Sequence, residues 1–172
     1  LEGIMNTVIP EPVIPSHQGP DARTVMPDLD VVTIAVKAAH NLSHLHTWCV
    51  ELTRAASREE VLDAFRAAPR IAFVRMADGL AALNSTATLM QDLGRPRGDL
   101  WEVALWEHGL AVHGNEAFYT YQVFNQAIVI PETIDAIRAL AGSEQDAQRS
   151  IALTDGSLGL VGDFFGGVGQ PR

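Results

Sequence analysis

Residues 43–52 constrain the fold more than any other stretch, because they read as a β-strand that carries two histidines on one face. Successive side chains of a strand point to opposite faces, so His44 and His46 share a face with Trp48 and with the apolar residues at positions 50 and 52. Imidazoles on a mostly apolar face are costly to bury unless their ring nitrogens are hydrogen-bonded. We therefore expect this strand to form the floor of a polar pocket.

The opposite face of the same strand carries Cys49, the single cysteine of the chain. One cysteine excludes an internal disulfide and favours a reducing compartment, so we expect a cytoplasmic protein. On strand parity Cys49 points away from the histidines, and we predict that it is a small core residue. A metal site is disfavoured, because the histidines lack metal-type spacing with a carboxylate as third ligand. The histidines considered for it are His17, His40, His44 and His46.

Composition restricts the class of protein. The 172 residues are enough for one domain with a sizeable core, and 47% hydrophobic with 19% charged residues indicates a globular chain. The formal net charge of −9 argues against a nucleic-acid-binding or membrane-binding surface, although a local cluster of Arg and His still permits an anionic small ligand. No apolar run is long enough to span a membrane, and the start lacks the pattern of a signal peptide. Because position 1 is not Met, we expect a fragment, a processed chain or a missing upstream part.

Apolar periodicity and turn residues predict strands alternating irregularly with helices. Strands are expected at residues 5–9, 31–38, 43–52 and 71–77, and in a hairpin of residues 100–112 and 116–125 around a tight turn at 113–115. Helices are expected as one turn at 19–26, then after the capping box at 57–60, at 84–93, from Pro131 to Gly142, and from Ser143 to about Gly156. The proline-rich residues 10–20 are expected to be a loop.

This order predicts an α+β fold with a mixed, largely antiparallel sheet and helices on one side. Residues 31–38 are expected to be a buried strand that pairs with 43–52 through residues 39–42. One catalytic, substrate-binding and oligomerisation domain is expected at 1–160, followed by a flexible Gly-rich tail at 161–172. No Gly-x-Gly-x-x-Gly follows a strand, so a dinucleotide-binding Rossmann domain is not expected within this chain.

Four groups of motifs, taken in order along the chain, resemble one known family. They are Pro-Ser-His-Gln-Gly-Pro-Asp at 15–21 with Thr-Val-Met at 24–26; His-Leu-His at 44–46 with Val-Glu-Leu at 50–52; Leu-Gly-Arg-Pro-Arg-Gly-Asp-Leu-Trp-Glu at 93–102 with Trp-Glu at 106–107; and Gln126 with Val-Ile-Pro-Glu at 129–132 and Asp-Ala-Ile-Arg at 135–138. Together they resemble the C-terminal half of archaeal-type (type II) phosphorylating glyceraldehyde-3-phosphate dehydrogenase.

The resemblance implies a catalytic domain built on a mixed sheet, which an N-terminal Rossmann domain outside this chain would complete. In the family a cysteine attacks an aldehyde, hydride passes to NAD or NADP, and inorganic phosphate releases the acyl group. The matching cysteine would lie upstream of Leu1, and the other domain would hold most of the cofactor. The implied partners are an aldehyde, possibly phosphorylated, and either further copies in a dimer or tetramer or a separate cofactor-domain chain, with no nucleic acid and no membrane.

The resemblance also assigns site residues. His44 and His46 match a His-x-His segment in which one histidine acts as the base beside the thiol, and Gln126 matches a glutamine that contacts the nicotinamide cofactor. His17 matches the first histidine of a pair that binds substrate phosphate. Gln18 stands where the second histidine is expected, and it brings hydrogen-bond donors without a cationic form.

Two further positions depart from the family near the same pocket. His40 and Asn41 stand where the family usually has Thr-Thr, and we take them as substrate-binding. Together with Gln18 they allow a related dehydrogenase for a different aldehyde, or a member with weakened chemistry.

Other readings of these residues stay open from the sequence alone. The two strand histidines are also compatible with a purely structural role in the sheet, and His17 with a polar surface loop. A non-catalytic chain that keeps the fold for oligomerisation or small-molecule binding is the alternative to the dehydrogenase.

Other polar and aromatic residues are assigned outside the pocket. Arg95 and Arg97 are expected at a subunit interface, and His108 and His113 at the surface near the hairpin. The aromatic residues expected in the sheet core and at interfaces are Trp101, Trp106, Phe118 and Tyr121.

Overall fold

The computed structural model describes residues 7–165, and its contacts divide the chain into two compact units, Leu1–Asn41 and Leu42–Arg172. The first unit contains β1 (Val8–Pro10), α1 (Gln18–Val25) and β2 (Val36–Ala38). The two strands are antiparallel, with Val8 opposite Ala38. The short helix predicted after the proline-rich loop is confirmed as α1. Of the strand predicted at 5–9, residues 5 and 6 lie outside the described part.

Ser16 and Thr33 hold the first unit together between its two strands. Oγ of the buried Ser16 lies 2.9 Å from Oγ1 of Thr33, and the backbone N–H of Ser16 donates to the carbonyl of Thr33 over 2.8 Å. The N–H of Gly19, in the first turn of α1, also donates to Oγ1 of Thr33. These bonds fix the loop that leads into α1.

The buried strand predicted at 31–38 is wrong in extent, burial and partner. Only β2 is strand, it pairs with β1, and Val32 and Ile34 are 68% and 74% exposed. β-Branched residues favour an extended backbone, but a strand forms only where another strand supplies hydrogen bonds. Residues 43–52 find that partner elsewhere, in the second unit.

The second unit is built on a five-stranded sheet. Its strands are β3 (His44–Glu51), β4 (Ile71–Val74), β5 (Val103–Trp106), β6 (Ala111–His113) and β7 (Glu116–Val123), in the order β3-β7-β5-β4 with β6 also beside β7. β4 and β5 are parallel and the other pairs are antiparallel. The prediction of an α+β fold with a mixed, largely antiparallel sheet is therefore confirmed.

Four α-helices connect or follow the strands of this unit, in addition to three short 3-10 turns. The α-helices are α2 (Arg58–Ala67), α3 (Leu83–Asp92), α4 (Val129–Leu140) and α5 (Ala147–Leu158), and the 3-10 turns are Met76–Asp78, Pro96–Gly98 and Glu107–Gly109. The last turn breaks the strand predicted at 100–112 into β5 and β6. The predicted hairpin is confirmed at its tip, where His113 pairs with Glu116 across Gly114 and Asn115.

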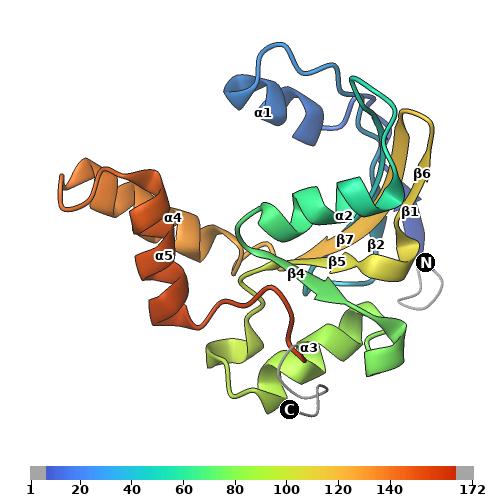
Figure 1. The fold of residues 1–172 in the computed structure, drawn as a ribbon. Coiled ribbons are helices and arrows are strands. Elements are labelled where there is room, and N and C mark those ends of the chain that lie inside the picture. Colours follow the sequence, from blue (N-terminus) through green and yellow to red (C-terminus); the bar gives the residue numbers. More distant parts are fainter. Residues whose placement is uncertain (1–6, 166–172) are drawn as a thin grey trace. The chain divides into compact units, whose positions relative to one another are not determined.

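Helices cover both faces of the sheet, which corrects the prediction of helices on one side. Leu62 of α2 packs in one core cluster with Phe73 and Leu105, whereas Met90 of α3 packs in another with the strand neighbours Val74 and Trp106. Adjacent residues of a strand point to opposite faces, so the two clusters lie on opposite sides. Figure 1 shows α2 lying across the sheet.

Local sequence signals account for the helix starts. The capping box before α2 is present, with Oγ of Ser57 accepting from the N–H of Glu60 and Oε2 of Glu60 accepting from the N–H of Ser57. α5 begins at Ala147, four residues later than the predicted start at Ser143, and its N-cap Asp146 accepts from the N–H of Arg149.

Arg95 and Glu102 form a buried ion pair that corrects the predicted interface role of Arg95. Two guanidinium nitrogens lie 2.6 and 2.7 Å from the two carboxylate oxygens, and Glu102 is fully buried. The guanidinium is 4.9 Å from the ring centre of Trp101 and 5.5 Å from that of Phe164. Glu102 also accepts from the N–H of Val161. The pair thus fastens the segment after α5 to the core.

That segment overlaps the predicted flexible tail. The N–H of Phe73 donates to the carbonyl of Gly162, and Asp163 pairs with Arg75 over 2.7 Å, so Gly162 and Asp163 lie against β4. Residues 166–172 of the predicted tail lie outside the described part. Arg97 pairs with Asp99 over 2.6 Å and is 62% exposed, which leaves its predicted interface role open.

Asp135 joins α4 to α5, which lie side by side (Figure 1). Its carboxylate accepts from Ser150 over 2.7 Å, from Thr154 over 2.6 Å and from Arg138 over 2.9 Å, and also from Arg70 at the start of β4. Burial opposes the ionisation of Asp135, but these hydrogen bonds outweigh it and lower the pKa of Asp135 to about 2.

The buried pair generates the first prediction. Glu102→Gln removes one charge and leaves the guanidinium of Arg95 buried without its partner, so we expect the free energy of unfolding to fall by about 3 kcal/mol or more. Arg149→Ala is the control, because Arg149 is 76% exposed and pairs with Glu144 at the surface, where such pairs contribute at most about 1 kcal/mol. Urea unfolding of the full-length protein measures both; equal losses would contradict the buried-pair argument.

Asp135 generates a second prediction, on the pH dependence of stability. Its pKa in the folded state, about 2, lies below its ordinary value of 3.8, so folding favours the ionised carboxylate. The contribution, about 2 kcal/mol, is complete above pH 4 and is lost as the pH falls towards 2. The difference in unfolding free energy between the parent protein and Asp135→Asn should therefore become smaller as the pH falls from 4 to 2. A difference in unfolding free energy that stays constant from pH 5 to pH 2 would contradict this prediction.

Candidate functional site

The pairing of β3 with β7 brings His44 to the exit of β7. In this register His44 lies opposite Val123, the last residue of β7, and the chain then passes through Asn125 and Gln126 towards α4. Nδ2 of Asn125 lies 2.8 Å from Nε2 of His44. Both residues are exposed, as is Gln126. The predicted base and the predicted cofactor contact thus share one corner of the sheet, which we call the histidine corner (His44, His46, Asn125, Gln126).

His46 forms the inner part of the histidine corner. It is half-buried, its ring stacks on Tyr121 with centroids 5.0 Å apart and planes at 15°, and the ring centroid of His44 is 5.9 Å away. Burial, and after it the neighbouring imidazole of His44, lower the pKa of His46. His46 is therefore neutral at pH 7 and keeps a lone pair that can accept a proton.

The strand parity predicted for residues 43–52 is confirmed, but the role predicted for Cys49 is wrong. His46, Trp48 and Val50 are half-buried on the face that α2 covers, and Cys49 is exposed on the other face. On that other face α3 covers the sheet at Gln122, whose side-chain oxygen accepts a hydrogen bond from Thr86 of α3 over 2.6 Å. Leu45 is the residue of β3 that pairs with Gln122. Cys49 lies four residues further along the strand, where α3 does not cover it.

The predicted phosphate contacts belong to the first unit. His17 is exposed and precedes α1 without capping it through its side chain, whereas Gln18 is half-buried and accepts a hydrogen bond from Oγ of Ser16. His40 and Asn41 are exposed after β2. All four lie in the unit Leu1–Asn41, and the histidine corner lies in the unit Leu42–Arg172.

The remaining histidines and aromatic residues follow their predicted roles. His108 and His113 are exposed, and Trp101 and Trp106 are 6% and 7% exposed in the core. The indole N–H of Trp106 donates to the carbonyl of Leu80. These residues support the sheet and do not contribute to the histidine corner.

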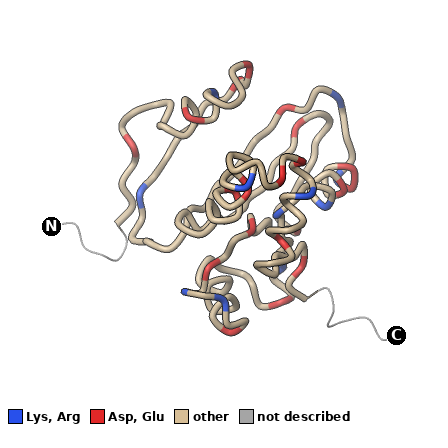
Figure 2. The backbone as a smooth tube through the Cα atoms, turned by 90° about the vertical axis from the view of Figure 1, so that its left-hand side faces the viewer, with Lys and Arg blue, Asp and Glu red and all other residues tan. Residues whose placement is uncertain are grey.

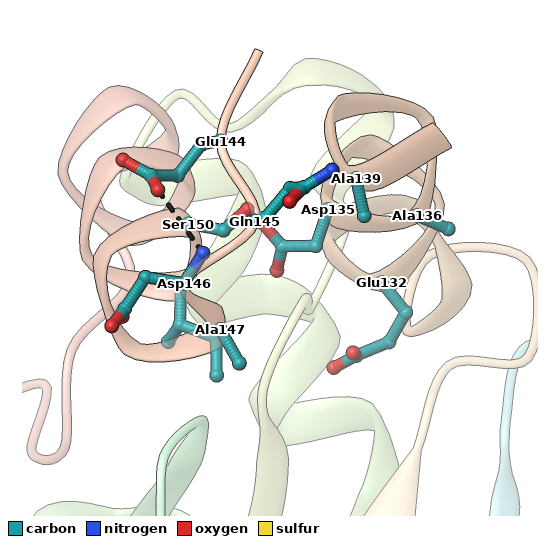
Figure 3. Close-up of a pocket in the computed structure, with 10 residues that line it drawn as sticks. Glu132, Asp135, Ala136, Ala139, Glu144, Gln145, Asp146, Ala147 and Ser150 are labelled. Atoms are coloured by element: carbon teal, nitrogen blue, oxygen red, sulfur yellow. Dashed lines mark hydrogen bonds between the residues drawn. The ribbon is translucent and has the colours of Figure 1, made fainter. Parts of the chain in front are cut away.

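A hollow between α4 and α5 is lined by four acidic residues and contains none of the predicted site residues (Figure 3). The four are Glu132, Asp135, Glu144 and Asp146. Their partners are internal: Glu132 pairs with Arg70, Glu144 accepts from Arg149 and from the N–H of Asp146, and Asp146 caps α5. Such a lining repels an anionic substrate, and its carboxylates serve the contact between the two helices.

The basic side chains of the described residues are engaged by acceptors of the chain itself. Ten of the eleven Lys and Arg residues form ion pairs, and Arg58 donates to the carbonyls of Leu110 and Glu107. Figure 2 shows blue segments interspersed with red ones along the tube. Between residues 7 and 165 no cluster of three His, Cys, Asp or Glu has a metal-binding arrangement. No helix in that part of the chain is long and apolar enough to cross a membrane.

Sequence reasoning missed Asn125 as a member of the histidine corner and Tyr121 as the residue on which His46 stacks. Tyr121 was expected in the sheet core or at an interface, and Asn125 was not singled out. The signal that finds both is the register of β3 on β7, which places them beside His44 and His46. Local patterns predict the two strands but do not give their register.

Comparison with known proteins gives the family. Residues 3–95 match the family model for the glyceraldehyde 3-phosphate dehydrogenase C-terminal domain. Over 161 residues the chain is 42% identical to glyceraldehyde-3-phosphate dehydrogenase of Methanopyrus kandleri, with 93% of this chain and 46% of the relative covered. The enzymes of the same name from Pyrobaculum calidifontis and Archaeoglobus fulgidus are 43% and 41% identical over 160 residues, each with 92% of this chain and 46% of the relative covered.

The matches thus extend along almost the whole chain, which spans about half the length of the relatives. They agree with the α+β architecture and with the order of the motifs along the sequence. The chain therefore belongs to the glyceraldehyde-3-phosphate dehydrogenase family, and it is a C-terminal domain of that family.

Proposed function

We propose that this chain is the catalytic domain of an NAD(P)-dependent aldehyde dehydrogenase that works through a thioester. The observation that carries the proposal is the histidine corner, where the half-buried neutral imidazole of His46 lies beside His44, and His44 contacts Asn125, the residue before the exposed Gln126. The proposed nucleophile is a cysteine supplied from the half of the relatives that this chain does not span. Cys49, exposed on the opposite face of β3, is not that nucleophile.

The proposed chemistry uses the two histidines in one proton transfer. An imidazole accepts the proton of the thiol, the sulfur forms a bond to the aldehyde carbon, and the negative charge moves to the aldehyde oxygen. A neighbouring N–H stabilises that oxygen. NAD or NADP, when bound, accepts the hydride, and an acyl acceptor, proposed to be inorganic phosphate, then releases the product from sulfur.

Gln126 is the residue of this chain that fits a nicotinamide cofactor. Its exposed side-chain amide, one residue after Asn125, can donate to and accept from a carboxamide. The sequence has no glycine-rich turn for a pyrophosphate after a strand, so the proposal gives the rest of the cofactor to the other half of the protein. This division agrees with a chain of about half the family length.

The proposed substrate is a small aldehyde with a polar or phosphorylated end. His17 is exposed and can donate to a phosphate. The side-chain oxygen of Gln18 accepts a hydrogen bond from Ser16, so only the amide N–H groups of Gln18 can bind a ligand. A glutamine carries no charge, so a dianion gains less at this position than it does from an imidazolium. The proposal therefore includes aldehydes less charged than glyceraldehyde 3-phosphate.

We further propose that the protein forms a homo-oligomer through β3. Among the described strands β3 pairs only with β7, so its other edge has free backbone groups along eight residues. Leu45 on this strand is 53% exposed and Cys49 is exposed beyond it. The non-catalytic alternative, a chain kept for assembly or ligand binding, shares this surface and differs in having no turnover.

The catalytic proposal is tested with the full-length protein. His44→Ala and His46→Ala should each lower kcat by roughly 10²- to 10⁴-fold, the usual effect of removing a general base or an oxyanion donor. His113→Ala is the matched control, because His113 is exposed at the tip of the β6–β7 hairpin. Initial rates of NAD(P)H formation measure all three; unchanged turnover in both corner variants would remove the histidines from the mechanism.

The oligomer proposal is tested by sedimentation at micromolar concentration. The parent protein should sediment as a dimer or tetramer, and Leu45→Lys should shift it towards the monomer, because a charge on the exposed face of an edge strand opposes strand pairing. Leu153→Lys, at a similarly exposed apolar position (53%) on α5, is the control. A monomeric parent, or equal effects of the two variants, would reject β3 as the interface.

A further inference from the structure

Asn125 contributes the closest polar contact of His44. Its Nδ2 lies 2.8 Å from Nε2 of the imidazole, a distance typical of a good hydrogen bond. An amide nitrogen can only donate, so in this arrangement Nε2 of His44 carries the lone pair. The proton of the neutral ring is then on Nδ1. One hydrogen bond thus selects one of the two tautomers.

The other neighbours of His44 leave this selection to Asn125. Within residues 7–165 no carboxylate lies at ion-pair distance from His44, so the usual acidic partner of a catalytic imidazole is not provided by this part of the chain. The ring contact of His44 is with His46, at 5.9 Å between centroids and 39° between planes. This separation is too long for a hydrogen bond between the two rings. Asn125 is therefore the residue placed to orient His44.

We propose that Asn125 is a positioning residue that holds His44 in the Nδ1–H tautomer, so that His44 donates a hydrogen bond into the site while His46 accepts the proton. The tautomer follows from the contact itself, and the division of roles rests on the proposed function. A ring held with Nδ1–H has no free lone pair, because Asn125 occupies the one on Nε2. His46 is bonded to neither His44 nor Asn125 in this way, and its stacking on Tyr121 uses the face of the ring and not its nitrogens.

The tautomer is read directly from the ring ¹⁵N chemical shifts of His44 in the full-length protein, labelled with ¹⁵N-histidine and kept at a pH where the ring is neutral. His44→Gln identifies the His44 signals. We expect the parent protein to show Nδ1 protonated and Nε2 unprotonated. Nε2 protonated in the parent would overturn the proposal, since the amide would then accept through its oxygen instead of donating.

Two variants of Asn125 sharpen this test. Asn125→Asp replaces the donor with an acceptor and should move the proton of His44 to Nε2, and Asn125→Ala should lower the Nδ1–H to Nε2–H ratio by about five-fold, the effect of one hydrogen bond of about 1 kcal/mol. Asn84→Asp is the matched control, because Asn84 is an exposed amide on α3. A His44 tautomer that is the same in the parent, Asn125→Asp and Asn125→Ala would overturn the positioning role.

The division of roles is tested by glutamine substitutions. Glutamine keeps a donor but cannot accept a proton as a base, so His44→Gln should lower kcat at most about ten-fold, whereas His46→Gln should lower it by 10²-fold or more. Equal or reversed losses would overturn the division. If the tautomer is as expected but the parent protein has no dehydrogenase activity, the inference on Asn125 stands and the proposed function is rejected.

Discussion

The antiparallel pairing of β3 with β7 is the interaction on which the histidine corner depends. Eight residue pairs hold the two strands in a single register, from His44 opposite Val123 to Glu51 opposite Glu116. A shift by one residue would turn His46 to the opposite face and leave Tyr121 without its stacking partner. The same register places the start of β3 at the exit of β7, where Asn125 and Gln126 follow. The candidate base, the orienting amide and the candidate cofactor contact therefore lie at the same end of the two strands, and no loop has to fold over them.

Arginine side chains connect the rest of the second unit to this sheet. Arg70 links the start of β4 to α4 and α5 through Glu132, Asp135 and Asp155, and Arg95 links Glu102 to the segment that follows α5. A buried guanidinium is tolerated only where carboxylates and carbonyls occupy its donors. An acidic chain provides those acceptors in excess, so these arginines join segments of the chain to one another. This separates the charged framework from the histidine corner, whose contacts are a hydrogen bond to an amide and ring stacking.

Features that depend on neighbours in sequence were predictable. The capping box of Ser57 and Glu60 needs residues three apart and is present as expected. The tight turn of the β6–β7 hairpin, predicted at residues 113–115, is found at Gly114 and Asn115. The parity of β3 was predictable for the same reason, because alternation is a local property of a strand. Features that depend on distant partners were not. The partner of residues 31–38, the cover over Cys49 and the role of Arg95 each depend on segments that local patterns cannot place.

By itself the sequence determined the class of fold, most of the helices and strands, and the pair of histidines on one strand face, because these follow from periodicity, capping and turn chemistry within short windows. Only the tertiary structure decided which strand β3 pairs with, that helices cover both faces of the sheet, and that Asn125 contacts His44. The physical reason is that strand pairing and side-chain burial depend on contacts between residues far apart in the chain. His44 and Asn125 are separated by 81 positions, and only the folded sheet brings them within hydrogen-bond distance.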